Sequence, residues 1–255
     1  MSLTTFAPIQ AYLRKSASRD RLTEQIGPFL ATVTHDDSNP YLNYAIPGDE
    51  AVPTAADVDA LITAYQRHER TPRLEYIREL APQVEAMLIA GGFTIERTTP
   101  LMIYDPALAG TVPLVAGFEL FSPQSDQEIF DVGSAQSEAY GGDGTPSVNA
   151  LPYWRKFAAA GGISVAAREI ATGKSVGGGV CDVPFNATTE LAGIGVRTNY
   201  RRRGIAGAMT AWLVQQALAA GTTHVFLMAA GEAEARIYGR VGFRLIGQVL
   251  HISHP

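Results

Sequence analysis

Residues 197–210, with the sequence RTNYRRRGIAGAMT, place three consecutive arginines directly before a glycine and a predicted helix. The helix macrodipole puts about half a positive charge at a helix N-terminus, so Arg201, Arg202 and Arg203 are unfavourable there by themselves. A polyanion bound at this point removes the conflict. Arginines at a helix start can also simply be solvated, so this segment alone leaves both explanations open.

The residues after the arginines suit a phosphate group. Gly204 and Gly207 let a ligand approach the backbone closely, and Ala206 is nearly as small. A turn of this kind, which opens a helix after a strand, leaves backbone N–H groups free to bind an anion. The segment has neither the Walker pattern nor the glycine spacing of the dinucleotide fingerprint. The sequence therefore predicts a site for a compact polyphosphate of a different kind.

The composition is that of an ordinary globular protein. The chain has 255 residues, is 46% hydrophobic and 18% charged, and carries a net charge of −5. This length suits one large domain or two smaller ones. Nucleic-acid binding needs a broad basic face, which this composition does not offer. We therefore expect no nucleic-acid partner, and we expect the arginine cluster to serve a compact ligand.

The single cysteine, Cys181, excludes an intrachain disulfide framework and indicates a reducing, cytoplasmic location. Apolar runs such as residues 224–230 are too short to cross a bilayer, and no secretory signal is visible at the N-terminus. We therefore expect no membrane partner. His224, His251 and His254 lack metal-ligand spacing with Cys181 or carboxylates, so no metal site is expected.

A boundary between two domains is predicted near residue 110, because residues 104–120 contain two prolines and two glycines. Before it, periodicity and turn residues predict strands at 27–35, 41–47, 73–77 and 93–104, with helices at 54–69 and 81–92. After it, they predict helices at 127–141, 148–162, 204–220 and 232–242, with strands at 162–170, 175–183, 189–198, 224–230 and 243–253.

The two halves repeat one another in outline. Gly92 and Gly242 each end a predicted helix, and each is followed by phenylalanine and a strand. The same step back of 38 residues leads from Gly92 to Thr54 and from Gly242 to Gly204, and both are predicted helix starts. This matching spacing predicts a degenerate internal repeat, although helix, glycine and strand is a common order that can arise by accident.

Two motifs resemble those of the GNAT family of N-acetyltransferases. The segment VRTNYRRRGIAGAM is similar to the family's acyl-CoA motif, a strand that enters R/Q-x-x-G-x-G/A. The segment ARIYGRVGF is similar to its second signature, a helix with an aliphatic residue and tyrosine that ends in Gly-Phe. One predicted helix and one strand separate them, and the resemblance covers roughly residues 115–255.

The resemblance implies an α/β (α+β) GNAT fold with a mixed, mostly antiparallel sheet flanked by helices. We expect two tandem domains, a degenerate GNAT-like domain at 1–110 and an acetyltransferase domain at 111–255. The first half has AVPTAA where the second has the arginines and Gly204, and Leu88 where the second has Tyr238. The alternative for the first half is an unrelated α+β domain.

The resemblance also implies roles in binding acetyl-CoA as co-substrate. The backbone around Ile194–Val196 would hold the pantetheine arm, and amides from Arg202 to Ala206 would take the pyrophosphate. Arginine side chains would add charge-assisted hydrogen bonds. The expected cofactor-binding residues are Ile194, Gly195, Val196, Arg201, Arg202, Arg203, Gly204, Ile205, Ala206 and Gly207.

Two residues are expected to be catalytic. Tyr238 falls where family members often keep a tyrosine near the cofactor sulfur, and it would protonate the departing thiolate. The alternative is a tyrosine packed in the core. Glu190 lies eleven residues before Arg201, where one branch of the family has its base; the alternative is an exposed charge at a strand end, and a β-bulge could redirect it. Gly231 stands where many family members have asparagine, which removes one expected cofactor contact.

These residues predict direct transfer of an acetyl group from acetyl-CoA to a primary amine, without a covalent intermediate. The acceptor, a small molecule or a peptide, is not identified, although the loop 139–149 with Asp143 lies where relatives line the acceptor pocket. The alternatives are an acyl-CoA sensor without turnover, an enzyme that uses another acyl group, and a nucleotide-binding regulator. The protein is expected to be a monomer or a homodimer.

Overall fold

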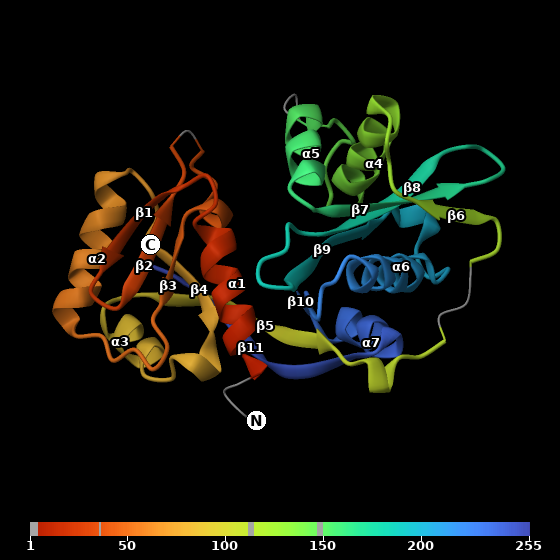
Figure 1. The fold of residues 1–255 in the computed structure, drawn as a ribbon. Coiled ribbons are helices and arrows are strands. Elements are labelled where there is room, and N and C mark those ends of the chain that lie inside the picture. The colour runs from red at the N-terminus through yellow and green to blue at the C-terminus, as the bar shows by residue number, and fades with distance from the viewer. Residues whose placement is uncertain (1–4, 36, 112–114, 147–149) are drawn as a thin grey trace. The chain divides into compact units, whose positions relative to one another are not determined.

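The computed structural model describes residues 5–35, 37–111, 115–146 and 150–255 (Figure 1). The chain forms two compact units. Unit 1 consists of Met1–Leu101, Met228–Gly231 and Leu245–Pro255, and unit 2 of Met102–Leu227 and Glu232–Arg244. The domain boundary near residue 110 stays a prediction.

Unit 1 contains three helices and a sheet with strand order β1-β2-β3-β4-β11, followed by β5, in the part of the chain that is described. The pairs β1–β2, β2–β3 and β4–β11 are antiparallel, and β3 and β4 are parallel. The bounds are α1 (Ala7–Ala17), β1 (Leu22–Ile26), β2 (Phe29–Val33), β3 (Tyr44–Pro47), α2 (Ala55–Arg67), β4 (Arg73–Ile77), α3 (Val84–Ala90), β5 (Thr94–Tyr104) and β11 (Phe243–Ser253).

In unit 2 the strand order of the sheet is β10-β9-β8-β7-β6. Its pairs are antiparallel except for β9 and β10. Helices α4 and α5 lie on one side of this sheet and α6 and α7 on the other (Figure 1). The bounds are β6 (Phe118–Phe121), α4 (Asp126–Ala139), α5 (Ala150–Ala159), β7 (Ile163–Glu169), β8 (Ser175–Cys181), β9 (Thr188–Val196), α6 (Ile205–Ala219), β10 (His224–Met228) and α7 (Glu232–Val241).

The same order of elements occurs in both units at the parallel pair. A helix joins the two parallel strands in each case, α2 between β3 and β4 and α6 between β9 and β10. Thr54 is the N-cap of α2 and Gly204 is the N-cap of α6. The two positions that the repeat spacing matched in the sequence are therefore equivalent ends of equivalent helices.

Most predicted elements are present, and three observed ones were not predicted. Strand β1 is exposed at four of its five residues, so it lacks the apolar alternation that marks a half-buried strand. Strand β6 begins within the segment 104–120, whose prolines and glycines indicated only a linker. Helix α1, which buries Ile9, Tyr12 and Leu13, was also missed. The last strand, β11, pairs with β4 of unit 1 through Leu250↔Tyr76 and its neighbours.

Glycines let α4 lie close to the sheet of unit 2. A Cβ atom on Gly178 of β8 would come within 2.5 Å of Val132 Cγ1, and one on Gly195 of β9 within 2.9 Å of Ala139 Cβ. Such distances are far below normal carbon contacts, so larger residues at these positions would push the helix away. The backbone of β8 and β9 thus fixes how near α4 can come.

We predict that Gly178→Ala lowers the free energy of unfolding by about 1–3 kcal/mol, because the added methyl overpacks this contact. Gly239→Ala is the matched control. It lies in exposed helix α7, its Cβ would meet nothing within 4 Å, and it should raise the stability by about 0.5–1 kcal/mol. Urea denaturation of the two variants measures both effects, and a Gly178→Ala protein as stable as the parent would contradict the packing argument.

Candidate cofactor and catalytic site

A β-bulge interrupts β9 just before the residues expected to hold the pantetheine arm. Gly178 of β8 pairs with Gly195, and Val180 pairs with Ala192. Gly193 and Ile194 therefore lie together opposite Gly179, and Gly193 takes a positive φ of 64° that suits glycine. The extra residue reverses the alternation of side chains along β9 from this point.

The bulge places Glu190 on the same face of β9 as Gly195. The two residues are five positions apart, so they would face opposite sides of a regular strand. Gly195 faces α4, and Glu190 follows the same alternation as Ala192, which is paired with Val180 on that face. Glu190 is half-buried and its carbonyl accepts a hydrogen bond from Asp182 N at 2.8 Å. Whether Glu190 is the base stays a prediction.

Strands β9 and β10 pair over only a short length. Their parallel register runs from Thr188↔His224 to Glu190↔Phe226, whereas β9 continues to Val196. Along the rest of β9, the edge that faces β10 has no strand partner among the described pairs. An open strand edge presents N–H and C=O groups that an extended, amide-containing ligand can pair with.

The N-terminus of α6 is left without a side-chain cap. Its N-cap is Gly204, in the left-handed conformation with a φ of 84°, and no side chain bonds to the first turn. The first turn also contains no acidic residue. Since the first amides of a helix have no partner within it, the N–H groups of Ile205, Ala206 and Gly207 are available to an anion.

The equivalent helix of unit 1 is closed at this end. Thr54 Oγ1 accepts a hydrogen bond from Asp57 N at 3.2 Å, and the Asp57 carboxylate accepts one from Thr54 N at 2.8 Å. This capping box already places a carboxylate where an anionic ligand would bind. Of the two equivalent helix ends, only that of α6 is open to a phosphate.

The arginines before α6 differ in what they contact. Arg201 donates from Nε to Val196 O at 3.0 Å and from Nη2 to Ala139 O at 2.8 Å. Ala139 is the last residue of α4, so this cation lies at the negative end of that helix. Arg203 donates to Asn199 O at 3.2 Å and stacks on the Tyr200 ring at 5.1 Å. Protein contacts therefore stabilise both side chains where they lie.

Arg202 is different. It is exposed, its φ of 62° is unusual for a residue other than glycine, and its side chain has no polar partner among the described residues. A strained backbone beside an open helix end marks a position whose side chain is available to a ligand. Of the three arginines, Arg202 is the best placed to donate to a phosphate.

Arg197, the first residue of the segment 197–210, was not predicted as a site residue. It is only 11% exposed, donates to Ser175 O at 3.0 Å and to Ser134 Oγ at 3.2 Å, and forms an ion pair with Glu138. Ser134 and Glu138 belong to α4, so Arg197 and Arg201 together fix that helix to the end of β9. Only the fold brings these residues together, because 62 positions separate Ala139 from Arg201.

Tyr238 of α7 is half-buried next to Phe243, with ring centroids 6.2 Å apart. Burial, together with the nearby Tyr140 phenol and Glu234, raises the pKa of Tyr238 to about 12. The hydroxyl therefore keeps its proton at neutral pH. No hydrogen bond of this hydroxyl occurs among the described residues, so it is available to donate. Its role as the acid stays a prediction.

Tyr140, the C-cap of α4, is a residue that the sequence did not single out within the loop 139–149. Its hydroxyl donates to Ile194 O at 3.2 Å, and a Cβ atom on Gly195 would lie 3.3 Å from its ring. The Tyr140 phenol thus lies near both Ile194, an expected cofactor contact, and Tyr238, the expected acid. In the sequence Tyr140 lies where the predicted helix 127–141 overlaps the loop 139–149, and no local signal there indicates a contact with Ile194.

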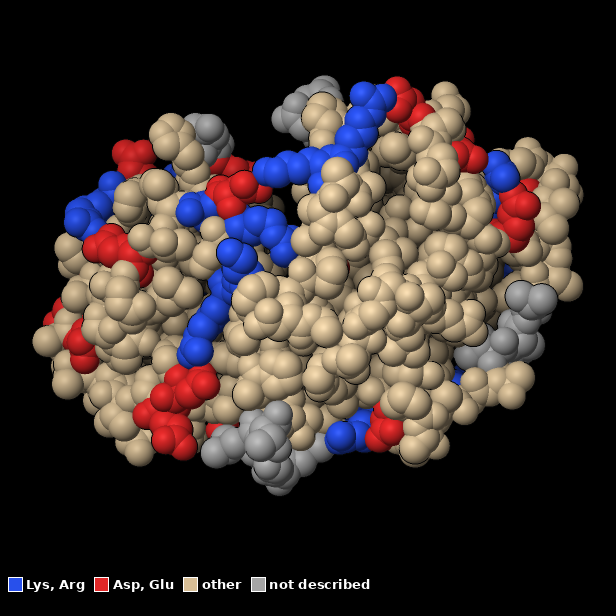
Figure 2. All heavy atoms as spheres, viewed as in Figure 1, with Lys and Arg blue, Asp and Glu red and all other residues tan. Residues whose placement is uncertain are grey.

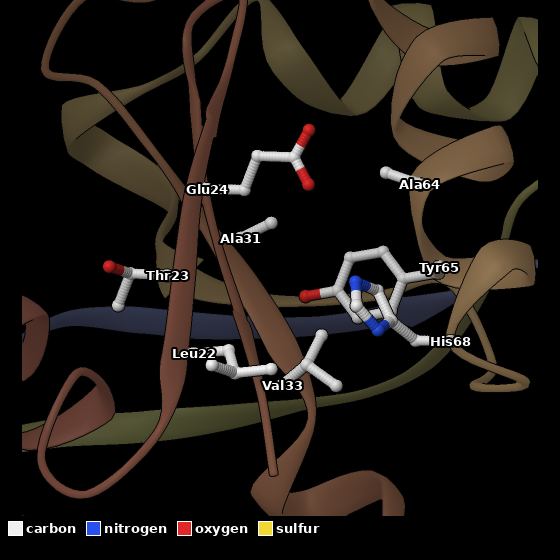
Figure 3. A pocket seen from close by; sticks show the side chains of 8 residues that line it. All are labelled: Leu22, Thr23, Glu24, Ala31, Val33, Ala64, Tyr65 and His68. Carbon is white, nitrogen blue, oxygen red and sulfur yellow. The ribbon is translucent and has the colours of Figure 1, made fainter. Parts of the chain in front are cut away.

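Unit 1 offers a cavity of only about 70 Å³ among the described residues (Figure 3). Tyr65 of α2, the C-cap His68 and Glu24 of β1 line it, and the other lining residues are Leu22, Thr23, Ala31, Val33 and Ala64. Ligand pockets usually measure about 300–1,000 Å³, so this cavity does not suit a substrate. No group of side chains in the described residues is arranged to hold a metal ion.

Charged side chains are sparse over part of unit 2. In the view of Figure 2, the surface over α6 and α7 is mostly uncharged, and the charged residues lie toward its margins. Among the helices that the structure describes, none is both long and apolar enough to cross a lipid bilayer.

Gly231, which stands where many members of the family have asparagine, belongs to unit 1, whereas Tyr238 belongs to unit 2.

The model of the acetyltransferase (GNAT) family matches residues 131–243. This segment contains β9, the three arginines Arg201–Arg203, α6 and Tyr238. Residues 131–243 form a GNAT domain. The resemblance seen in the sequence is therefore confirmed. No curated protein sequence matches this chain significantly.

Solved structures share the fold of the whole chain. A GCN5-related N-acetyltransferase from Kribbella flavida is 24% identical, with a TM-score of 0.82 over 100% of this chain and 97% of its own. One from Sphaerobacter thermophilus is 18% identical, with a TM-score of 0.66 over 89% and 78%. A tandem GNAT protein of the clavulanic acid biosynthesis pathway is 14% identical, with a TM-score of 0.65 over 94% and 86%. The α/β fold class is confirmed.

Two arginines of the GNAT domain should separate stability from binding. Arg201→Gln removes two hydrogen bonds to carbonyls and a cation from the end of α4, so it should lower the free energy of unfolding by about 1–3 kcal/mol. Arg202→Gln should leave stability within about 0.5 kcal/mol, because none of the described residues forms a polar contact with its side chain, yet weaken binding of a polyphosphate ligand several-fold. Thermal unfolding and calorimetric titration with acetyl-CoA test both. The assignment is wrong if the two variants behave alike.

Proposed function

We propose that the protein is an acyltransferase that moves an acetyl group from acetyl-CoA to a primary amine by direct transfer. The observation that carries this proposal is the open N-terminus of α6, with Gly204 as N-cap and Arg202 beside it. The family match supports the class of reaction, because the matched segment includes this helix end. Acetyl-CoA as the donor and an amine as the acceptor are our proposals.

The residues around α6 fit the polyanionic part of acetyl-CoA. The amides of Ile205, Ala206 and Gly207 and the Arg202 side chain would take the pyrophosphate. The open edge of β9, from Ile194 to Val196, would pair with the amide groups of the pantetheine arm. The capped end of α2 in unit 1 offers no such cradle, so we expect one acetyl-CoA per chain.

The chemistry needs a base and an acid. When bound, acetyl-CoA supplies a thioester, an acetyl group already activated for transfer to nitrogen. Glu190 takes a proton from the acceptor ammonium, directly or through water, so that the nitrogen lone pair can attack. Tyr238 donates its phenol proton to the sulfur as the carbon–sulfur bond breaks. Since its pKa is about 12, the tyrosine is protonated whenever the reaction begins.

The acceptor is an amine of a small molecule or a peptide. Glu190 lies on the face of β9 that α4 covers, so this carboxylate would attract a cationic amine approaching from that side. We expect unit 1 to have lost cofactor binding and to contribute packing or the shape of the acceptor site. We also expect the protein to act in the cytoplasm as a monomer or homodimer, without metal, membrane or nucleic acid.

The variants Ala206→Glu and Ala206→Gln, whose side chains are of equal size, test the phosphate site at the N-terminus of α6. A carboxylate in the first turn of α6 stabilises the helix by about 0.3–1 kcal/mol, so the Glu variant folds. It should nevertheless bind acetyl-CoA at least about 10-fold more weakly than the Gln variant, because it repels the phosphates. Calorimetric titration measures the difference. Equal affinity in the two variants would remove α6 as the phosphate site, and no binding by the parent would remove the enzyme proposal.

A further inference from the structure

Two side chains on one face of α4 bond to consecutive carbonyls of β9. Gln136 Nε2 donates to Gly193 O at 2.8 Å, and Tyr140 donates through its hydroxyl to Ile194 O at 3.2 Å. Gln136 and Tyr140 are four positions apart, so they project from the same side of the helix. Successive carbonyls of a regular strand point in opposite directions, and the bulge at Gly193 is what lets one helix face reach both.

The contact between Tyr140 and β9 depends on the missing side chain of Gly195. An added Cβ there would lie 3.3 Å from Tyr140 Cε2. Tyr140 is nevertheless 67% exposed, and it is the C-cap of α4, directly after the last helical residue. Tyr140 is therefore held by one hydroxyl hydrogen bond at an exposed helix end, and it can leave without unfolding the helix.

Tyr140 occupies a group that the proposed ligand needs. The Ile194 carbonyl belongs to the open edge of β9, where the pantetheine arm would pair. The Tyr140 phenol also lies close enough to Tyr238 to raise its pKa. Tyr140 thus lies where the arm would meet the acid.

We infer that Tyr140 is a displaceable gate over the acyl end of the site, and that acetyl-CoA must break the Tyr140–Ile194 hydrogen bond to bind. This inference rests on the proposed function. The gate concerns the pantetheine arm alone, because the phosphate cradle of α6 is formed by other residues. Displaced Tyr140 then frees the Ile194 carbonyl for the ligand and opens the space beside Tyr238.

Tyr140→Phe tests the gate, because it removes the hydroxyl and keeps the ring over Gly195. Without the competing hydrogen bond, the variant should bind acetyl-CoA about 2- to 10-fold more tightly than the parent. It should bind adenosine 5′-diphosphate, which has the pyrophosphate but no pantetheine arm, with unchanged affinity. Tyr41→Phe in unit 1 is the control, a tyrosine that is also exposed, and it should change neither affinity.

The outcomes separate the two proposals. Tighter acetyl-CoA binding by Tyr140→Phe alone, with unchanged diphosphate binding, supports the gate. Equal or weaker acetyl-CoA binding by Tyr140→Phe overturns the gate and leaves the proposed function intact, and so does a gain that extends to the diphosphate. If the folded parent binds neither ligand, both the proposed function and the gate are wrong.

Discussion

The unsatisfied amides at the start of α6 are the constraint around which the site of this protein is arranged. Every helix begins with N–H groups that lack a partner within the helix, and proteins usually satisfy them with a side chain. Unit 1 does so at α2, through Thr54 and Asp57. In unit 2, by contrast, no side chain caps the first amides of α6 after Gly204. The residue near this helix end is Arg202, and the first turn has no carboxylate. Two equivalent helices thus differ at the one point that decides whether an anion can bind.

The surroundings of α6 explain how the chain tolerates its crowded arginines. Arg201 bonds to the last carbonyl of α4, where a helix attracts positive charge, and Arg203 stacks on Tyr200. The like charges at the start of α6 are therefore offset partly by the end of another helix. The hydrogen bond from Arg201 to Ala139 also fixes α4 against β9. The glycines of β8 and β9 allow this close packing, which brings Tyr140 to the bulge in β9.

Local patterns predicted much of this structure. The Thr54 cap, the helix behind Gly204 and strand β4 follow from residue types within a short window, and so did the GNAT resemblance. Strand β1 was missed because its exposed side chains lack alternation. The contact of Arg201 with Ala139 and the hydrogen bond of Tyr140 with Ile194 join residues more than fifty positions apart. No local signal marks such contacts, so the site residues of α4 appeared only with the fold.

Backbone amide signals of the ¹⁵N-labelled protein, followed by NMR during titration with acetyl-CoA, test the central claim most directly. The account predicts saturable shifts of Ile205, Ala206 and Gly207 at the start of α6, with the first-turn amides of α2, including Asp57, unmoved because Thr54 caps them. Saturation of the protein without any shift of the three α6 amides would show that the ligand binds elsewhere, and it would contradict the account.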